Sequence, residues 1–309
     1  MELSTGRKSG RMSADSIGKK GGLYCYVMTP YDDEGAVDFD TLERYIDAVI
    51  EGGVDGLTCI ASTCEGVYLT EQERSDVAEA VCRGAKDRVP VNAGIGGFST
   101  RQVIRYAEQA QKCGAASLMT DMQTYFSIPF EAAKQHYADL AKSVSVPIRI
   151  YNITQPTGFD FTPDRLLEMG EIEAIDSVKE SSGIATRVRD IRSLCGDRFA
   201  VFCGFHFVSL EVFKYGADGW ECGMHPLIVK DCVDLYRALI ARDFETGARL
   251  YERLKSLFLF FKDFGVPQAL KVMSTWSDIK LGRPRPPLPE LTPDQTARLK
   301  QIMKDLELI

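Results

Sequence analysis

A lysine closes a short apolar run in the segment VKESSG, where Lys179 directly follows Val178. A neutral amine in such a place attacks a ketone or an aldehyde and loses water to form an imine, and the protonated imine withdraws electrons from the neighbouring carbon. The amine must first lose its proton, which burial or a nearby positive charge favours. The segment therefore indicates covalent amine chemistry at Lys179, with a merely solvated lysine as the alternative.

Two other segments supply groups that this chemistry needs. Tyr151 lies near the end of the run PIRIYN, and a tyrosine hydroxyl can relay the protons of dehydration and of carbon–carbon cleavage. Arg149 should point to the same face of that strand, because a strand alternates its faces, and it would bring positive charge towards the lysine. Ser62 and Thr63, in ASTCEG, suit a carboxylate next to the carbonyl through their hydroxyl and backbone N–H groups.

Short apolar runs that read as strands alternate with amphipathic helical patterns from residue 22 onward. The expected strands are LYCYVM (23–28), GLTCI (56–60), VPVNAG (89–94), ASLMT (116–120), PIRIYN (147–152), IDSVK (175–179), FAVFCG (199–204) and ADGWEC (217–222). Eight strand–helix units predict an α/β fold, the (β/α)₈ TIM barrel, with an open doubly wound sheet as the alternative. In such a barrel the catalytic side chains lie where strands end and loops begin, which is where the candidate residues occur.

The chain divides into three parts on this pattern. Residues 1–21 are polar and basic without an apolar centre, so we expect a flexible tail or a leader and not a signal peptide. Residues 22–225 should form the barrel core. Residues 226–309 read as purely helical, with a proline-rich connection, and should supply the last barrel helix and a C-terminal helical extension.

Composition excludes several classes of protein. The net charge of −7 argues against a nucleic-acid partner, and no apolar run approaches the length of a membrane span. Nine cysteines without paired spacing fit reduced thiols in the cytoplasm. The histidines, His136, His206 and His225, are not at metal-ligand spacing, so we expect no metal site.

Five motifs in a fixed order give the sequence a family resemblance. They are TPYDDEGAVDFDTL (29–42), ASTCE (61–65), YNITQPTG (151–158), VKESSG (178–183) and RPPL (285–288). From about residue 22 to the C-terminus the chain resembles the dihydrodipicolinate synthase / N-acetylneuraminate lyase family of Schiff-base barrels. The resemblance implies a cofactor-free imine between Lys179 and a 2-oxo acid, usually pyruvate, with Tyr151 as the proton shuttle and Ser62 and Thr63 holding the carboxylate. It also implies a homo-oligomer, a dimer or a tetramer.

Several positions depart from the family pattern, and most lie at strand ends. Dihydrodipicolinate synthase has an arginine for the carboxylate of aspartate semialdehyde where this chain has Pro156. The usual proline of the family falls near Asp121, and Tyr125 is our candidate for the catalytic tyrosine that the family contributes across a subunit interface. His206 stands in GFH, where the family has an acidic residue. We expect His206 and Asp121 to meet a hydroxyl or amino group of a longer 2-oxo acid.

Two charged residues, Arg149 and Glu221, occupy positions that are generally aliphatic in the family. We expect Arg149 to tune the lysine or to bind a polar group of the substrate. The sequence therefore predicts a Schiff-base lyase that performs aldol cleavage or condensation, or dehydration or deamination from the same imine. The alternatives are dihydrodipicolinate synthase itself and a non-catalytic regulator that binds a 2-oxo acid. A further alternative, a phosphate-sugar isomerase barrel, would need a phosphate-binding glycine loop, and the sequence supplies little of one.

Overall fold

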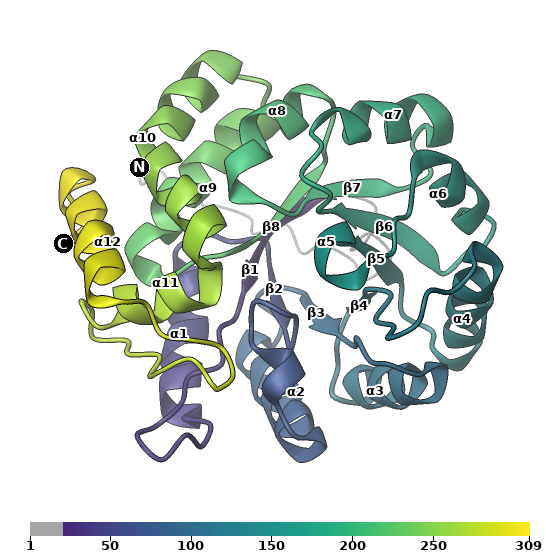
Figure 1. The fold of residues 1–309 in the computed structure, drawn as a ribbon, viewed down its shortest axis with the longest axis horizontal. Coiled ribbons are helices and arrows are strands. Elements are labelled where there is room, and N and C mark those ends of the chain that lie inside the picture. Colours follow the sequence, from purple (N-terminus) through teal and green to yellow (C-terminus); the bar gives the residue numbers. More distant parts are fainter. Residues whose placement is uncertain (1–20) are drawn as a thin grey trace, which may run out of the picture.

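The computed structural model describes residues 21–309, which form a closed parallel barrel of eight strands surrounded by helices (Figure 1). The strands are β1 (Gly22–Tyr26), β2 (Gly56–Cys59), β3 (Val91–Gly94), β4 (Ser117–Thr120), β5 (Ile148–Asn152), β6 (Ile175–Glu180), β7 (Ala200–Cys203) and β8 (Gly219–Gly223). Closure of β1 against β8 confirms the predicted TIM barrel and excludes the open sheet. The predicted tail lies outside the described residues except for Gly21.

Helices follow the strands and cover the barrel. They are α1 (Phe39–Glu51), α2 (Glu71–Ala85), α3 (Thr100–Lys112), α4 (Phe130–Ser143), α5 (Thr154–Thr157), α6 (Pro163–Met169), α7 (Thr186–Cys195), α8 (Ser209–Lys214), α9 (Pro226–Ile240), α10 (Phe244–Phe264), α11 (Val266–Ser274) and α12 (Pro293–Asp305), with 3₁₀ turns η2 (Gly66–Tyr68) and η3 (His206–Val208). The start of α2 is capped by the pair Thr70 and Glu73. The Thr70 hydroxyl accepts a hydrogen bond from the backbone N–H of Glu73, and the Glu73 carboxylate accepts one from the backbone N–H of Thr70.

Strand register places the candidate residues side by side. Tyr151 on β5 is paired with Lys179 on β6, and Arg149 is paired with Ser177 one inward position deeper. Because side chains on one strand alternate, Arg149 and Tyr151 both point into the barrel. The same alternation gives β1 two inward tyrosines, Tyr24 and Tyr26.

Inward side chains fill the barrel in layers, as is usual for this fold. The layer nearest the strand ends is an apolar group of Tyr26, Ala61, Cys64, Met119 and Tyr151. At the other end Tyr24, Ala200 and Phe202 form a second apolar group. Between them lie polar side chains that are fully buried: Thr58, Asn92, Ser117, Arg149, Ser177 and Glu221.

The C-terminal helices pack against one side of the barrel, where α10 contacts α9, α8 and η3, and α11 contacts β8 (Figure 1). Two buried histidines belong to this region. His206 packs its ring 5.3 Å from Phe258 and 5.1 Å from Phe261 on α10, and its Nε2 lies 3.0 Å from the carbonyl oxygen of Gly223. His225 begins α9, and its Nε2 lies 3.1 Å from the carbonyl oxygen of Ile279.

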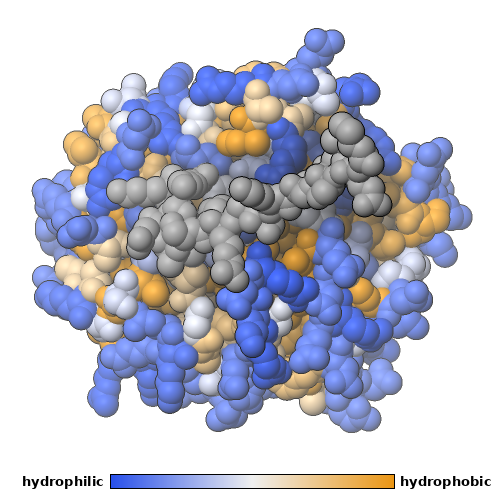
Figure 2. Space-filling model, turned by 180° about the vertical axis from the view of Figure 1, so that it is seen from behind, coloured by the Kyte–Doolittle hydropathy of each residue, from blue (hydrophilic) through white to orange (hydrophobic). Residues whose placement is uncertain are grey.

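The face behind the view of Figure 1 carries mostly polar residues around its rim, with apolar residues in smaller areas between them (Figure 2). Over residues 21–309, none of the helices combines the length and the apolar composition that crossing a bilayer requires. All nine cysteines are free.

The buried His206 should make the fold sensitive to acid. Burial lowers the pKa of His206 from 6.5 to about 4. Between these pH values His206 is therefore protonated in the unfolded chain and neutral in the folded chain. The free energy of unfolding should therefore fall as the pH drops from 6.5 to 4, by on the order of 3 kcal/mol from this group. In His206→Gln, which can still donate to Gly223, denaturant titrations should show a shallower fall. Parallel curves for the two proteins would contradict the assignment.

Candidate active site

Lys179 lies at the carboxyl end of β6 and is 1% exposed, so its amine is inside the barrel and not in solvent. The next residue, Glu180, holds the strand end in place by accepting from Asn152 Nδ2 at 2.8 Å and from the backbone of Ser182 at 2.6 Å. Gly204 follows β7 and leaves room for the lysine, because a Cβ there would meet Lys179 Cε at 3.0 Å and Ser181 Oγ at 1.8 Å. The strand-end lysine is thus buried and held in a fitted space.

The nearest aromatic group to this amine is Tyr151. Lys179 Nζ lies 3.5 Å from the centroid of the Tyr151 ring, and the ring is almost fully buried. This contact follows from the register of β5 and β6, which puts the two residues opposite each other. The structure therefore brings together the two residues that the sequence predicted as nucleophile and proton shuttle.

The loop after β2 presents Ser62 and Thr63 at the same end of the barrel. Its backbone is strained, since Ile60 has φ 57° and Glu65 has φ 60°, and a β-branched residue rarely adopts this left-handed conformation. Hydrogen bonds from the backbone N–H groups of Cys64 and Gly66 to the carbonyl of Ala61 close the turn. Strain that the surrounding contacts maintain is typical of a binding loop.

A buried ion pair anchors this loop to the C-terminal extension. Glu65 is fully buried, and its Oε1 lies 3.0 Å from Nζ of Lys271 on α11. The same amine donates to the carbonyls of Thr29, Leu281 and Arg283 at 3.0–3.1 Å. The position of the Ser62–Thr63 loop therefore depends on α11 and on the segment that follows it.

A cavity of about 400 Å³ opens beside the loops that follow β2, β3, β4 and β5. Ser62, Arg74, Asp121, Gln123 and Pro156 are among its lining residues. Lys179 and Tyr151 lie buried beneath this end of the barrel and do not line the cavity. Two of the predicted site residues, Ser62 and Asp121, thus face one common space.

Asp121 directly follows β4 and accepts from Gln123 Nε2 at 3.2 Å. Burial raises the pKa of its carboxyl above the ordinary value, although the Gln123 hydrogen bond and the charges of Lys179 and Arg74 act in the opposite direction. A carboxyl in this condition can accept a hydrogen bond when charged and donate one when protonated.

Arg149 and Glu221 form a buried ion pair in the polar layer beneath the lysine. Both side chains are at most 1% exposed. Glu221 Oε1 also accepts from Asn92 Nδ2 at 2.9 Å and from Thr58 Oγ1 at 3.1 Å, and Arg149 Nε donates to Ser177 Oγ at 3.1 Å. The pair therefore joins strands from several parts of the barrel.

This pairing changes the interpretation of Arg149. Its guanidinium carbon lies 3.5 Å from the centroid of Phe202 and 5.0 Å from that of Tyr24, and the side chain does not line the cavity. Because Glu221 neutralises its charge, Arg149 presents no net positive charge to Lys179. The structure thus gives Arg149 a partner inside the barrel in place of the predicted substrate.

Two further predicted residues, His206 and Tyr125, do not line the cavity. His206 is 5% exposed and enclosed by Trp220, Phe258 and Phe261, so the expected contact with substrate does not fit its position. The reason is that η3 begins at His206 and turns the ring towards α10. Tyr125 is 87% exposed in the loop after β4 and stacks edge-on against Phe126, outside the site of its own chain.

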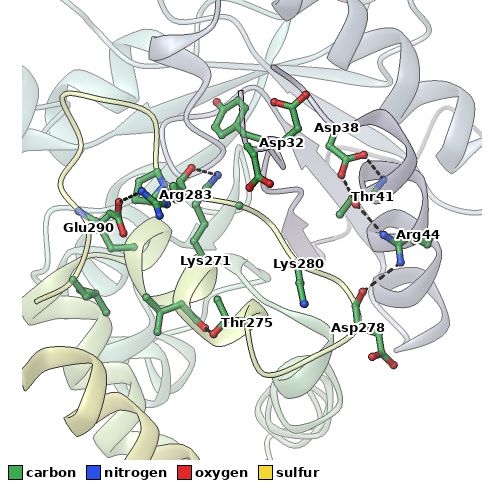
Figure 3. A pocket seen from close by; sticks show the side chains of 17 residues that line it. Asp32, Asp38, Thr41, Arg44, Lys271, Thr275, Asp278, Lys280, Arg283 and Glu290 are labelled. Carbon is green, nitrogen blue, oxygen red and sulfur yellow. Dashed lines mark hydrogen bonds and ion pairs between the residues drawn. The ribbon is translucent and has the colours of Figure 1, made fainter. Parts of the chain in front are cut away.

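A second hollow, of about 720 Å³, lies elsewhere, between the loop after β1, α11 and the segment after α11 (Figure 3). Its walls carry both signs of charge, including Asp32, Arg44, Lys280 and Glu290. None of the predicted site residues, all of which the structure describes, lines it. Across residues 21–309, no group of three or more potential metal ligands is close enough to hold an ion.

Sequence reasoning did not identify Tyr26 as a site residue. Lys179 Nζ lies 4.9 Å from the centroid of the Tyr26 ring, and the Tyr26 hydroxyl donates to Glu221 Oε2 at 3.4 Å. The signal was present in the alternation of LYCYVM, which puts both tyrosines on one face. An apolar run that contains tyrosine is nevertheless read first as core.

The closed barrel with a buried lysine and tyrosine at adjacent strand ends defines a (β/α)₈-barrel lyase. The sequence pattern of the Dihydrodipicolinate synthetase family matches residues 19–306, and the chain belongs to this family.

Relatives and solved structures agree with this membership. The 4-hydroxy-tetrahydrodipicolinate synthase of Archaeoglobus fulgidus is 30% identical over 295 residues, which cover 93% of this chain and 99% of that protein. The enzyme of the same name from Geobacter sulfurreducens is 30% identical over 92% of this chain and 97% of its own. The dihydrodipicolinate synthase structure from Aquifex aeolicus matches with a TM-score of 0.88 and 26% identity, over 93% of this chain and 98% of that one.

Removing one member of the Arg149–Glu221 pair should cost far more stability than removing both. Glu221→Leu leaves a buried guanidinium without its counter-ion, which should lower the free energy of unfolding by about 3–5 kcal/mol. Adding Arg149→Met should restore most of that loss. Chemical denaturation of the two single variants and the double variant measures the coupling.

Asp234→Ala, which breaks an exposed pair with Lys230, is the control and should lower the free energy of unfolding by at most about 0.5 kcal/mol. Additive losses would show that the pair does not act as a unit.

Proposed function

We propose that the protein is a Schiff-base-forming lyase that acts on pyruvate or a pyruvate-like 2-oxo acid. One observation carries the proposal: the buried amine of Lys179 lies 3.5 Å from the ring centroid of Tyr151, at the end of the barrel where lyase chemistry occurs. Membership of the family supports it. The reaction would be aldol cleavage or condensation, or dehydration or deamination from the same imine.

The covalent step uses only the lysine and the 2-oxo acid. The neutral amine adds to the ketone carbon, and the carbonyl oxygen leaves as water after taking up two protons, so that a C=N bond replaces the C=O bond. The protonated imine then accepts the electron pair of a bond broken at the adjacent carbon and becomes an enamine. We propose that no metal or other cofactor takes part.

The neighbouring residues supply protons and binding. Tyr151 would carry a proton between the departing oxygen and the substrate, since its ring borders the amine. Ser62 and Thr63 would hold the carboxylate of the 2-oxo acid on the loop that Glu65 anchors. Asp121, which lines the same cavity as Pro156, would meet a hydroxyl or amino group further along the substrate.

A second copy of the chain would complete the site. Four large apolar side chains on the loops after β2, β3 and β4 are more than half exposed: Val67, Phe98, Tyr125 and Phe126. Val67 and Phe98 line the same cavity as Ser62, so this apolar surface adjoins the proposed site. A homodimer that covers it would remove the apolar area from water and would bring Tyr125 of one copy towards the site of the other.

Dihydrodipicolinate synthase activity is the second candidate, because the relatives in the comparison carry that function in their names. It requires a group that binds the carboxylate of aspartate semialdehyde. Pro156 stands on α5 at the cavity wall and has no donor to offer. Arg74 also lines the cavity, but its guanidinium already donates to the carbonyls of Gly66 and Gly94. These contacts favour a different acceptor.

Trapping with borohydride tests the nucleophile. Incubation with a panel of 2-oxo acids, including pyruvate, followed by borohydride should add one adduct to the protein by intact mass spectrometry. Lys179→Arg keeps the positive charge but cannot form the imine, and it should lose the adduct completely.

The matched control is Lys271→Arg, which changes the other buried lysine, whose amine is held by carbonyls and Glu65. It should retain the adduct if the protein folds. An adduct that persists in Lys179→Arg would refute the assignment of the nucleophile, and the mass of any adduct identifies the acid.

Condensation of pyruvate with aspartate semialdehyde should be slow in the native protein. Pro156→Arg should raise its kcat/KM by roughly tenfold to a hundredfold, the range expected for one charge-assisted hydrogen bond to the carboxylate. Pro156→Gln, which offers a donor without charge, is the control and should gain less. Semialdehyde turnover by the native protein comparable to that of hydroxylated 2-oxo acids would instead establish the second candidate.

A further inference from the structure

Tyr26, on β1, is a second aromatic neighbour of the reactive amine. Lys179 Nζ lies over the Tyr26 ring at 4.9 Å from its centroid and over the Tyr151 ring at 3.5 Å. Both distances fall within the range of about 6 Å at which an aromatic face attracts a cation. We infer that Tyr26 is a further catalytic residue, whose ring face stabilises the protonated imine on Lys179; the inference rests on the proposed function.

The Tyr26 ring is held in this position from below. Its hydroxyl donates to Oε2 of Glu221 at 3.4 Å. The other oxygen of Glu221 accepts from Thr58, Asn92 and Arg149, so the carboxylate itself is fixed. Glu221 is therefore a positioning residue that acts through Tyr26.

The Tyr26 hydroxyl stays protonated under these conditions. Burial, and then the negative charge of Glu221, raise the pKa of Tyr26 well above its ordinary value. The hydroxyl thus remains a donor to Glu221 and does not act as the base of the reaction. What Tyr26 offers the imine is its ring.

The ring acts on one protonation state of the imine only. The protonated imine carries a positive charge that the face of the ring attracts, whereas the neutral imine carries none. Tyr26 therefore favours the charged form, which is the form that withdraws electrons from the adjacent carbon. The visible consequence is a higher pH at which the imine loses its proton.

A purely structural role would give a different result. Tyr26 packs with Ala61, Cys64, Met119 and Tyr151, and a residue that only fills space would change stability without changing the protonation of the imine. The two roles are separated by measuring how trapping depends on pH.

The experiment uses cyanoborohydride, which reduces the protonated imine, with pyruvate and the intact protein between pH 6 and pH 10. In Tyr26→Leu the fall in trapping rate on the alkaline side should move to lower pH by roughly 0.5–1.5 pH units. Tyr26→Phe keeps the ring but loses the hydrogen bond to Glu221 and is the matched control, so its curve should move by less than that of Tyr26→Leu. Tyr26→Met, unbranched and flexible, replaces Tyr26→Leu if the latter does not unfold cooperatively.

The outcomes are distinct. An adduct in all proteins with the same alkaline limb would overturn the role of Tyr26 and leave the proposed function intact. A shift in Tyr26→Phe equal to that in Tyr26→Leu would also overturn it, because the effect would then belong to the hydroxyl. If the native protein forms no adduct with pyruvate or with any other 2-oxo acid tried, both the inference and the proposed function fail.

Discussion

The ion pair between Arg149 and Glu221 is the contact on which the interior of this barrel depends. Two charges inside a closed barrel lose their water, and only mutual pairing with further hydrogen bonds offsets that cost. Here the bonds come from Thr58 on β2, Asn92 on β3 and Ser177 on β6, while the pair itself joins β5 to β8. Strands far apart in the sequence are thereby tied across the barrel axis. Lys179 and the two tyrosines beside it are supported by this polar layer.

A second buried ion pair, between Glu65 and Lys271, stabilises the loop after β2. The loop that carries Ser62 and Thr63 contains left-handed backbone at Ile60, which costs free energy. The contact of Glu65 with Lys271 holds it in that shape from α11, a helix outside the barrel. The C-terminal extension is therefore part of the machinery that shapes the site, even though it lies far from the lysine in the sequence.

The sequence was sufficient for features that depend on local order. The alternation of short apolar runs with amphipathic helical patterns predicted the eight strands. The positions of Lys179 and Tyr151 at strand ends predicted that they lie close together, because adjacent parallel strands end at the same side of the barrel. Contacts across the barrel could not be predicted from local order. The partner of Arg149 is 72 residues away and meets it only after closure. His206 follows a strand as the pattern required, yet the turn η3 rotates it into an aromatic cluster, a rotation that no spacing rule specifies.

The same contacts limit where a substrate can extend. Below Lys179 the polar layer is buried and held by the Arg149–Glu221 ion pair, and on the β1 side the Tyr26 ring lies beside the amine. A cavity of about 400 Å³ lies on the side of β2 to β5, and Asp121 and Pro156 are among its lining residues. In the proposed reaction, a 2-oxo acid joined to Lys179 would therefore extend from its third carbon towards Asp121. In the proposed reaction, selection among 2-oxo acids would then rest on the carboxyl of Asp121, whose pKa burial raises, and on Pro156, which can neither donate a hydrogen bond nor carry charge.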